Sequence, residues 1–286
     1  MSIPHSTAIR VTTEPMRWLF RSVSALALIT GFSLYVLSER TDHFFSWTIL
    51  PPITAAFFGA CFWTAAIIAF LASRQHVWIR ARIAGPVILS FTVLTLIATL
   101  LHLEKFHLFS SDMVARGAAW AWMILYVVVP PVTLVLLPLQ LRTPGHDPAR
   151  SRPLFRWLRV TLGIQAGVLV AVGLVLFLAP QTATFWPWKL TPLTAQVTGG
   201  WLLAVGGAAA QTVWENDWSR VAIALISYTA LGALQLVALA RYVSQIQWSS
   251  LWSWLYTLFV VTIVVVGVVC WRTAWPAAVE SPELAS

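Results

Sequence analysis

The sequence contains few charged residues. Asp, Glu, Lys and Arg make up 10% of its 286 residues, hydrophobic residues make up 59%, and the mean hydropathy is +0.79. A soluble domain is usually about a quarter charged. The chain therefore lacks the polar surface that an ordinary soluble domain needs, and its composition favours an all-α integral membrane protein.

Cysteines and recognisable catalytic motifs are also scarce. The two cysteines, Cys61 and Cys270, both lie within apolar runs, which indicates apolar core positions and is otherwise uninformative. The sequence contains no phosphate-binding loop, dinucleotide fingerprint, HExxH or Gly-x-Ser-x-Gly. These absences favour a non-enzymatic protein.

Long apolar stretches, in contrast, are frequent. A transmembrane helix needs about 20 mostly apolar residues. We predict eight such helices, at residues 19–38, 52–72, 83–103, 117–140, 158–179, 193–213, 221–241 and 251–271.

The predicted helices fall into two weakly similar halves. Arg17-Trp18-Leu19 recurs as Arg156-Trp157-Leu158, and Pro52 and Gly59 recur as Pro192 and Gly199 at nearly the same shift. An even number of helices per copy predicts two parallel four-helix repeats rather than inverted ones. The expected segments are an N-terminal segment (1–16), a first repeat (17–141), a basic linker (142–155), a second repeat (156–272) and a tail (273–286).

The basic residues indicate the orientation of these helices. Most of them lie in the N-terminal segment, the connection between the second and third predicted helices, and the linker. By the positive-inside rule, both termini should be cytoplasmic in a multi-pass protein of the plasma membrane. The net charge of +8 then reflects topology and indicates no nucleic-acid partner. The expected partner is the lipid bilayer, with a membrane-protein partner or a homo-oligomer left open.

Small, proline and tryptophan residues give more local predictions. The pairs Ala55/Gly59 and Ala195/Gly199 should provide close helix packing near the axis that relates the repeats. Prolines within the fourth stretch, at 130, 131 and 138, predict a kinked or broken helix. Many tryptophans lie near predicted helix ends, and we expect them in the interfacial aromatic belt: Trp18, Trp47, Trp78, Trp157, Trp186, Trp188, Trp214, Trp218, Trp248 and Trp271.

Ionisable residues gather on the predicted outer side of the first repeat. The candidate functional cluster is Glu39, Asp42, His43, His102, Glu104 and His107. Imidazoles and carboxylates could bind zinc, copper or iron if the two loops meet. However, surface loops need polar residues in any case, and two histidines five residues apart do not share a helical face. Haem is disfavoured, because only His102 lies near a span.

The predicted membrane interior contains no Asp, Glu, Lys or Arg near the middle of any span; its polar residues are glutamines and hydroxyls. Proton- and ion-coupled carriers generally need ionisable groups at that depth. This absence disfavours coupled transport but permits passage of an uncharged solute.

Two outer segments carry a resemblance to other proteins. Glu39-Arg40-Thr41-Asp42, Trp47 and Pro51-Pro52, together with Leu103-Glu104-Lys105-Phe106-His107, resemble uncharacterised bacterial multi-pass membrane proteins. The resemblance implies a multi-pass membrane fold and transfers no activity.

Three functional hypotheses follow. The leading one is a non-enzymatic accessory or assembly subunit, or a binder of apolar ligands, because the interior is uncharged and catalytic motifs are missing. The second is a membrane metal or redox protein that uses the outer His/carboxylate cluster. The third is a transporter of an uncharged solute.

Overall fold

The computed structural model describes residues 8–279, with side chains described for residues 8–270. Residues 1–7 of the expected N-terminal segment and 280–286 of the expected tail lie outside the described part. The described residues form helices and no strands; two isolated backbone bridges involve the N-terminal segment.

Eight long helices build the molecule, and each contains nearly all of one predicted apolar stretch. They are α1 (Glu14–Tyr35), α3 (Pro52–Ser73), α5 (Ala84–Leu101), α6 (Met113–Leu141), α7 (Arg156–Leu178), α8 (Pro192–Glu215), α9 (Trp218–Arg241) and α10 (Leu251–Val279). The connections contain short helices: α2 (Thr41–Phe44), α4 (Trp78–Ala81), η1 (Leu103–Lys105), η2 (Pro180–Phe185) and η3 (Val243–Gln245).

Seven of the long helices are long and apolar enough to cross a membrane, with α4 and α5 counted as one span. Helix α8 is the exception. It is 24 residues long but rich in Gly, Thr and Gln, which lowers its hydropathy, and most of its first half is buried among other helices. The protein is therefore a multi-pass helical membrane protein with lipid-facing apolar helices.

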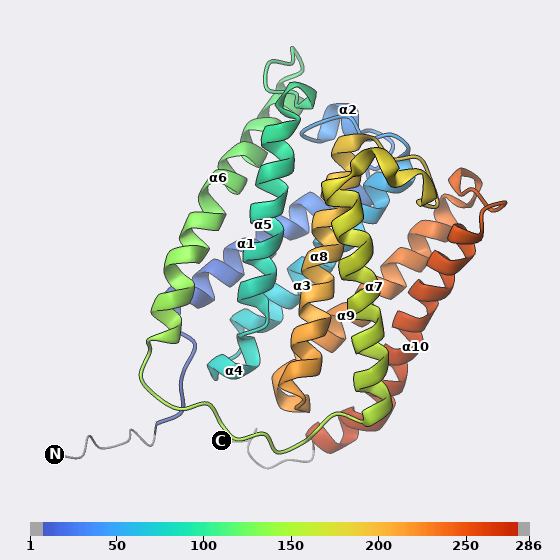
Figure 1. The fold of residues 1–286 in the computed structure, drawn as a ribbon. Helices are drawn as coiled ribbons and strands as arrows, with labels where there is room; N and C mark the ends of the chain where they lie inside the picture. Colours follow the sequence, from blue (N-terminus) through green and yellow to red (C-terminus); the bar gives the residue numbers. More distant parts are fainter. Residues whose placement is uncertain (1–7, 280–286) are drawn as a thin grey trace.

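Helix contacts cross between the two predicted repeats. Within the repeats, α1 packs along α3 and α7 packs along α8. Between the repeats, α3 packs against α9, and α5 packs against α8. Helices α6 and α10 lie at opposite edges of the bundle, beside α5 and α9 (Figure 1). We call the end of the bundle that carries α2 the α2 end. The end that carries α4 and residues 142–155 is the linker end.

The predicted small residues lie at close helix contacts. A Cβ added at Gly59 would lie 2.5 Å from the backbone nitrogen of Tyr35 in α1. A Cβ added at Gly199 would lie 2.7 Å from the backbone nitrogen of Phe177 in α7. The neighbouring Ala55 and Ala195 are fully buried. Glycine thus permits the same kind of backbone approach in α1–α3 and in α7–α8.

Two local features refine the sequence-based expectations. Helix α6 is continuous through Pro130, Pro131 and Pro138, so it is not broken there, while a kink stays a prediction. Among the tryptophans expected in the interfacial belt, four are at most 5% exposed: Trp47, Trp78, Trp186 and Trp188. Their position near helix ends was correctly predicted, but their side chains pack inward; the rings of Trp186 and Trp188, for example, contact Phe57 of α3 and Tyr256 of α10. Trp18, Trp157 and Trp214 are exposed, as a belt requires, and the side chain of Trp271 lies outside the described part.

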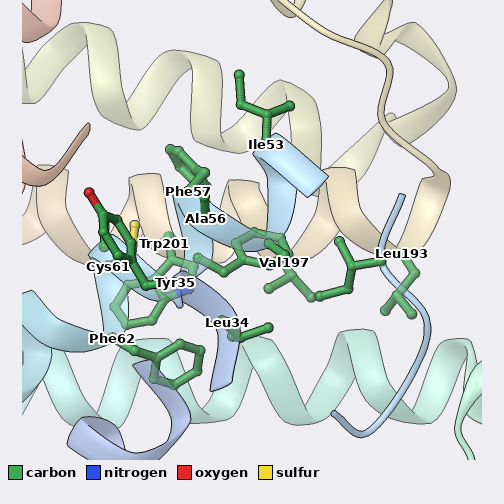
Figure 2. Close-up of a cluster of buried hydrophobic side chains, with 14 of the residues drawn as sticks. Leu34, Tyr35, Ile53, Ala56, Phe57, Cys61, Phe62, Leu193, Val197 and Trp201 are labelled. Atoms are coloured by element: carbon green, nitrogen blue, oxygen red, sulfur yellow. The ribbon is translucent and has the colours of Figure 1, made fainter. Parts of the chain in front are cut away.

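One hydrophobic core joins both halves of the chain. Figure 2 shows side chains of α1, α3 and α8 in a single cluster, including Tyr35, Phe62 and Trp201. Phe62 and Trp201 are in perpendicular ring contact, with centroids 5.0 Å apart. The middle of the bundle is therefore built from helices far apart in sequence.

Candidate functional site

The two loops that carry the predicted His/carboxylate cluster meet at the α2 end. The backbone nitrogen of His107 donates to Ser46 O at 2.9 Å. The His107 ring lies between Phe45 O, 3.1 Å from Nδ1, and the Thr48 hydroxyl, 3.1 Å from Nε2. A carbonyl only accepts, so Nδ1 donates to Phe45 O, and in the neutral ring Nε2 then accepts from the Thr48 hydroxyl. Both ring nitrogens thus have a partner within the protein.

His43 pairs with a residue outside the predicted cluster. Its Nδ1 contacts Asp112 Oδ2, and Asp112 also caps α6, with Oδ1 accepting from Val114 N at 2.8 Å and Ala115 N at 3.3 Å. The hydrogen bond from His43 lowers the pKa of Asp112, and the two backbone donors add to this effect. The arrangement accounts for His43 and Asp112 as a helix-capping pair.

The remaining predicted residues lie apart from these two. His102 Nε2 is 2.9 Å from Gln196 Oε1 of α8. Glu39 approaches Tyr242 and Arg241, Glu104 pairs with Lys105, and Asp42 is exposed. Within the described residues, no group of three or more His, Cys, Asp or Glu is placed to hold a metal ion. The six residues thus occupy several small polar contacts at the α2 end.

Two cavities lie deeper, between the long helices. Cavity A, of about 60 Å³, is formed mainly by α3, α8 and α9, with Val87 of α5 and Leu162 of α7. Cavity B, of about 50 Å³, lies between α1, α3, α5 and α6. Both are lined almost entirely by apolar atoms, and no charged residue is among their lining residues in the described part of the chain. Each therefore suits an uncharged molecule.

The two cavities adjoin. Ala65, Ile68, Val87 and Trp201 line both of them. The Trp201 ring is stacked on Phe91, with centroids 3.6 Å apart and an interplanar angle of 25°. A rigid aromatic wall thus stands where the halves of the chain meet.

Most hydrogen-bond donors in the wall of cavity A already donate to acceptors within the protein. The hydroxyls of Thr64, Thr212 and Ser227 donate to carbonyls of their own helices, at 2.7–2.9 Å. The Tyr228 hydroxyl donates to Gln165 Oε1 at 3.2 Å. These oxygens retain lone pairs, so the cavity wall offers weak acceptors in an apolar setting.

A separate ionic network closes the linker end. Glu215, whose side chain is 2% exposed, pairs with Arg82 and with Arg220, the latter at 3.2 Å. Asp147 of the linker lies 3.6 Å from Arg82 and 3.8 Å from Arg10. The charges that the sequence places outside the spans thus bind the N-terminal segment and the linker to the helices.

Asp217 holds the linker and the start of α9 together. Its carboxylate accepts from Ser151 N at 2.7 Å, Arg152 N at 2.9 Å and Ser219 N at 3.0 Å. Burial alone would raise the pKa of Asp217, but these hydrogen bonds outweigh burial and lower it.

Comparison with known proteins adds no functional assignment. No protein-family model matches the sequence, and no curated protein or solved structure is significantly similar to it. The functional argument therefore rests on the bundle and its cavities.

Trp201 was missed by the sequence analysis. The sequence places it in the middle of an apolar stretch, away from the helix ends where tryptophan carries a recognisable signal. The small residues of α8 were noted for packing, although the cavities lie beside the same helix.

Proposed function

We propose that the chain spans the plasma membrane eight times, as two parallel four-helix repeats with the linker end in the cytoplasm. Corresponding helix pairs support this arrangement: α1–α3 with α7–α8, α3–α9 with α8–α5, and α5–α6 with α9–α10. The glycine contacts at Gly59 and Gly199 repeat in the same way. These correspondences suit a pseudo-two-fold axis along the membrane normal, near which α3 and α8 meet.

Helix α8 is the eighth span in this proposal, despite its lower hydropathy. A helix that faces protein on most sides can carry Gly, Thr and Gln, because its polar groups are not exposed to lipid. Gln196, 8% exposed, donates to Phe177 O at 3.1 Å, which satisfies one such group. Its composition therefore suits a central position.

We propose that the function of this bundle is to bind a small uncharged molecule within the membrane. The observation that carries this proposal is the adjoining pair of cavities, both lined by apolar side chains. Ligand sites in helical bundles commonly lie between helices and combine apolar walls with a few polar groups. The ligand binder is thus the part of the leading hypothesis that the geometry favours.

Cavity filling tests this proposal. Ala65 lines both cavities, so Ala65→Leu should weaken binding of isobutene to the detergent-solubilised protein, measured by shifts of methyl NMR resonances from cavity residues. Ala171→Leu is the matched control, because Ala171 is an exposed residue of α7. Equal titrations of wild type and both variants, or no shifts in any of them, would contradict ligand binding in these cavities.

Transport of an uncharged solute is the second candidate, favoured by the shared wall of the cavities. If a solute passes from one cavity to the other, proteoliposomes should show flux of a small neutral solute that Ala65→Leu reduces and Ala171→Leu does not. Binding without flux would exclude transport and would favour a receptor or a ligand-dependent subunit.

A further inference from the structure

Trp201 carries a hydrogen-bond donor with no acceptor. The residue is 3% exposed, and within the described part of the chain its indole Nε1 has no hydrogen-bond partner. A buried donor without an acceptor is costly, most of all in a bilayer where water is scarce. The donor therefore calls for an explanation.

Other buried indoles in the protein do find acceptors. Trp188 Nε1 donates to Thr54 Oγ1 at 2.9 Å, and Trp122 Nε1 donates to Thr99 Oγ1 at 3.1 Å. Trp47, Trp78 and Trp186 also have an unpartnered Nε1, but none of them is among the residues lining cavity A or cavity B. Trp201 thus combines an unpartnered donor with a place in the wall of both cavities.

The surroundings of Trp201 hold its ring in place. Phe91 stacks on the ring, and Phe62 meets it at an interplanar angle of 85°. Because Gly200 and Leu202 precede and follow Trp201 in the continuous helix α8, its backbone is fixed as well. A donor on a ring that is already ordered is suited to recognition, since little further ordering is needed on binding.

We propose that the ligand is a small uncharged molecule with one hydrogen-bond acceptor, such as a carbonyl or ether oxygen, which accepts from Trp201 Nε1. This inference rests on the proposed function and specifies its ligand class. Cavity A, at about 60 Å³, exceeds the roughly 10–15 Å³ that one water needs but is below the roughly 150 Å³ of a cavity that binds benzene. The molecule therefore has a few heavy atoms in contact with apolar walls, and its acceptor separates it from a plain hydrocarbon.

The test compares two probes of nearly equal shape, acetone and isobutene, which differ in a carbonyl oxygen. Protein labelled with ¹⁵N-tryptophan gives indole N–H resonances, and the one missing from Trp201→Phe belongs to Trp201. Acetone should move this resonance downfield and isobutene should not. Trp201→Phe, which keeps the aromatic packing, should weaken acetone binding about three- to tenfold, the size of one hydrogen bond, and leave isobutene binding unchanged.

Trp186→Phe is the matched control. It also removes a buried, unpartnered indole N–H but does not line the cavities, so it should change neither titration. Acetone and isobutene partition differently into detergent. The ratio of their affinities is therefore compared between wild type and each variant, because the partition is the same in all three proteins. If Trp201→Phe is unfolded, the Trp201 resonance is assigned instead as the indole signal that Phe91→Leu shifts, because Phe91 stacks on this ring. The response of that signal to acetone in the wild type then decides the question.

The outcomes separate this inference from the proposed function. If both probes bind the cavities and Trp201→Phe affects them equally, the cavities bind ligands but the donor role is wrong. A Trp201 resonance that contacts water and ignores acetone would show that water fills the site, which also overturns the inference. If neither acetone nor isobutene binds the protein, the proposed function is overturned as well.

Discussion

Replacing Gly59 by alanine tests how closely α1 and α3 must approach. The new Cβ would lie 2.5 Å from Tyr35 N and 2.7 Å from Tyr35 Cα, so the backbones would have to separate. Overpacking of this kind costs about 1–3 kcal/mol. Alanine gains up to about 1 kcal/mol over glycine in helix propensity. Gly59→Ala should therefore lower the free energy of unfolding by about 1–2 kcal/mol.

Gly163→Ala in α7 is the matched control, because a Cβ there has no neighbour within 4 Å. It should leave stability unchanged or raise it by up to about 1 kcal/mol. Reversible unfolding in mixed micelles of non-ionic detergent and sodium dodecyl sulfate measures both variants on one scale. Equal stability of Gly59→Ala and Gly163→Ala would refute the close approach of the two backbones.

Two further predictions concern the ends of the bundle. Asp217→Ala should lower stability at neutral pH by about 1–2 kcal/mol, the usual cost of a lost N-cap. Because the pKa of Asp217 is lowered in the folded protein, its carboxylate stabilises the fold above the ordinary pKa of 3.8, and this stabilisation is lost as pH falls. The difference in free energy of unfolding between wild type and Asp217→Ala should therefore become smaller in acid. A difference that does not change with pH would contradict a role for the ionised carboxylate. At the α2 end, both ring nitrogens of His107 are engaged, so elemental analysis of gently purified protein should give iron, copper and zinc well below one atom per chain. A stoichiometric metal that is lost on replacing His43 or His102 would instead support the metal hypothesis.

The helix positions could be predicted from the sequence because hydropathy depends on local composition. Predicted stretches such as 52–72 and 251–271 begin where the helices begin, since Pro52 and the polar residues before Leu251 mark those boundaries. The first helix begins at Glu14 instead of 19, because Glu14 and Pro15 favour a helix start that hydropathy does not register.

The site could be predicted only in part, because it depends on contacts between distant segments. The predicted topology places both outer loops on the same side of the bundle, and His107 does contact Ser46, but no local pattern indicates that both of its ring nitrogens find partners. In the same way, the position of Trp47 near a helix end predicts an interfacial side chain. Its burial depends on Phe106 and Trp122, which come much later in the chain.

The pairing of α3 with α9 and of α5 with α8 has a consequence for biosynthesis. Helix α3 ends at Ser73 and α9 begins at Trp218, so the ribosome adds the 144 residues 74–217 between the two partners. At about 5–20 residues per second, α3 waits on the order of ten seconds for α9. During that interval lipid or the insertion machinery must cover buried residues such as Phe57, whose carbonyl later accepts from Gln235 of α9. A chain released before α8 and α9 would expose these surfaces in the membrane and should be a substrate for quality-control proteolysis.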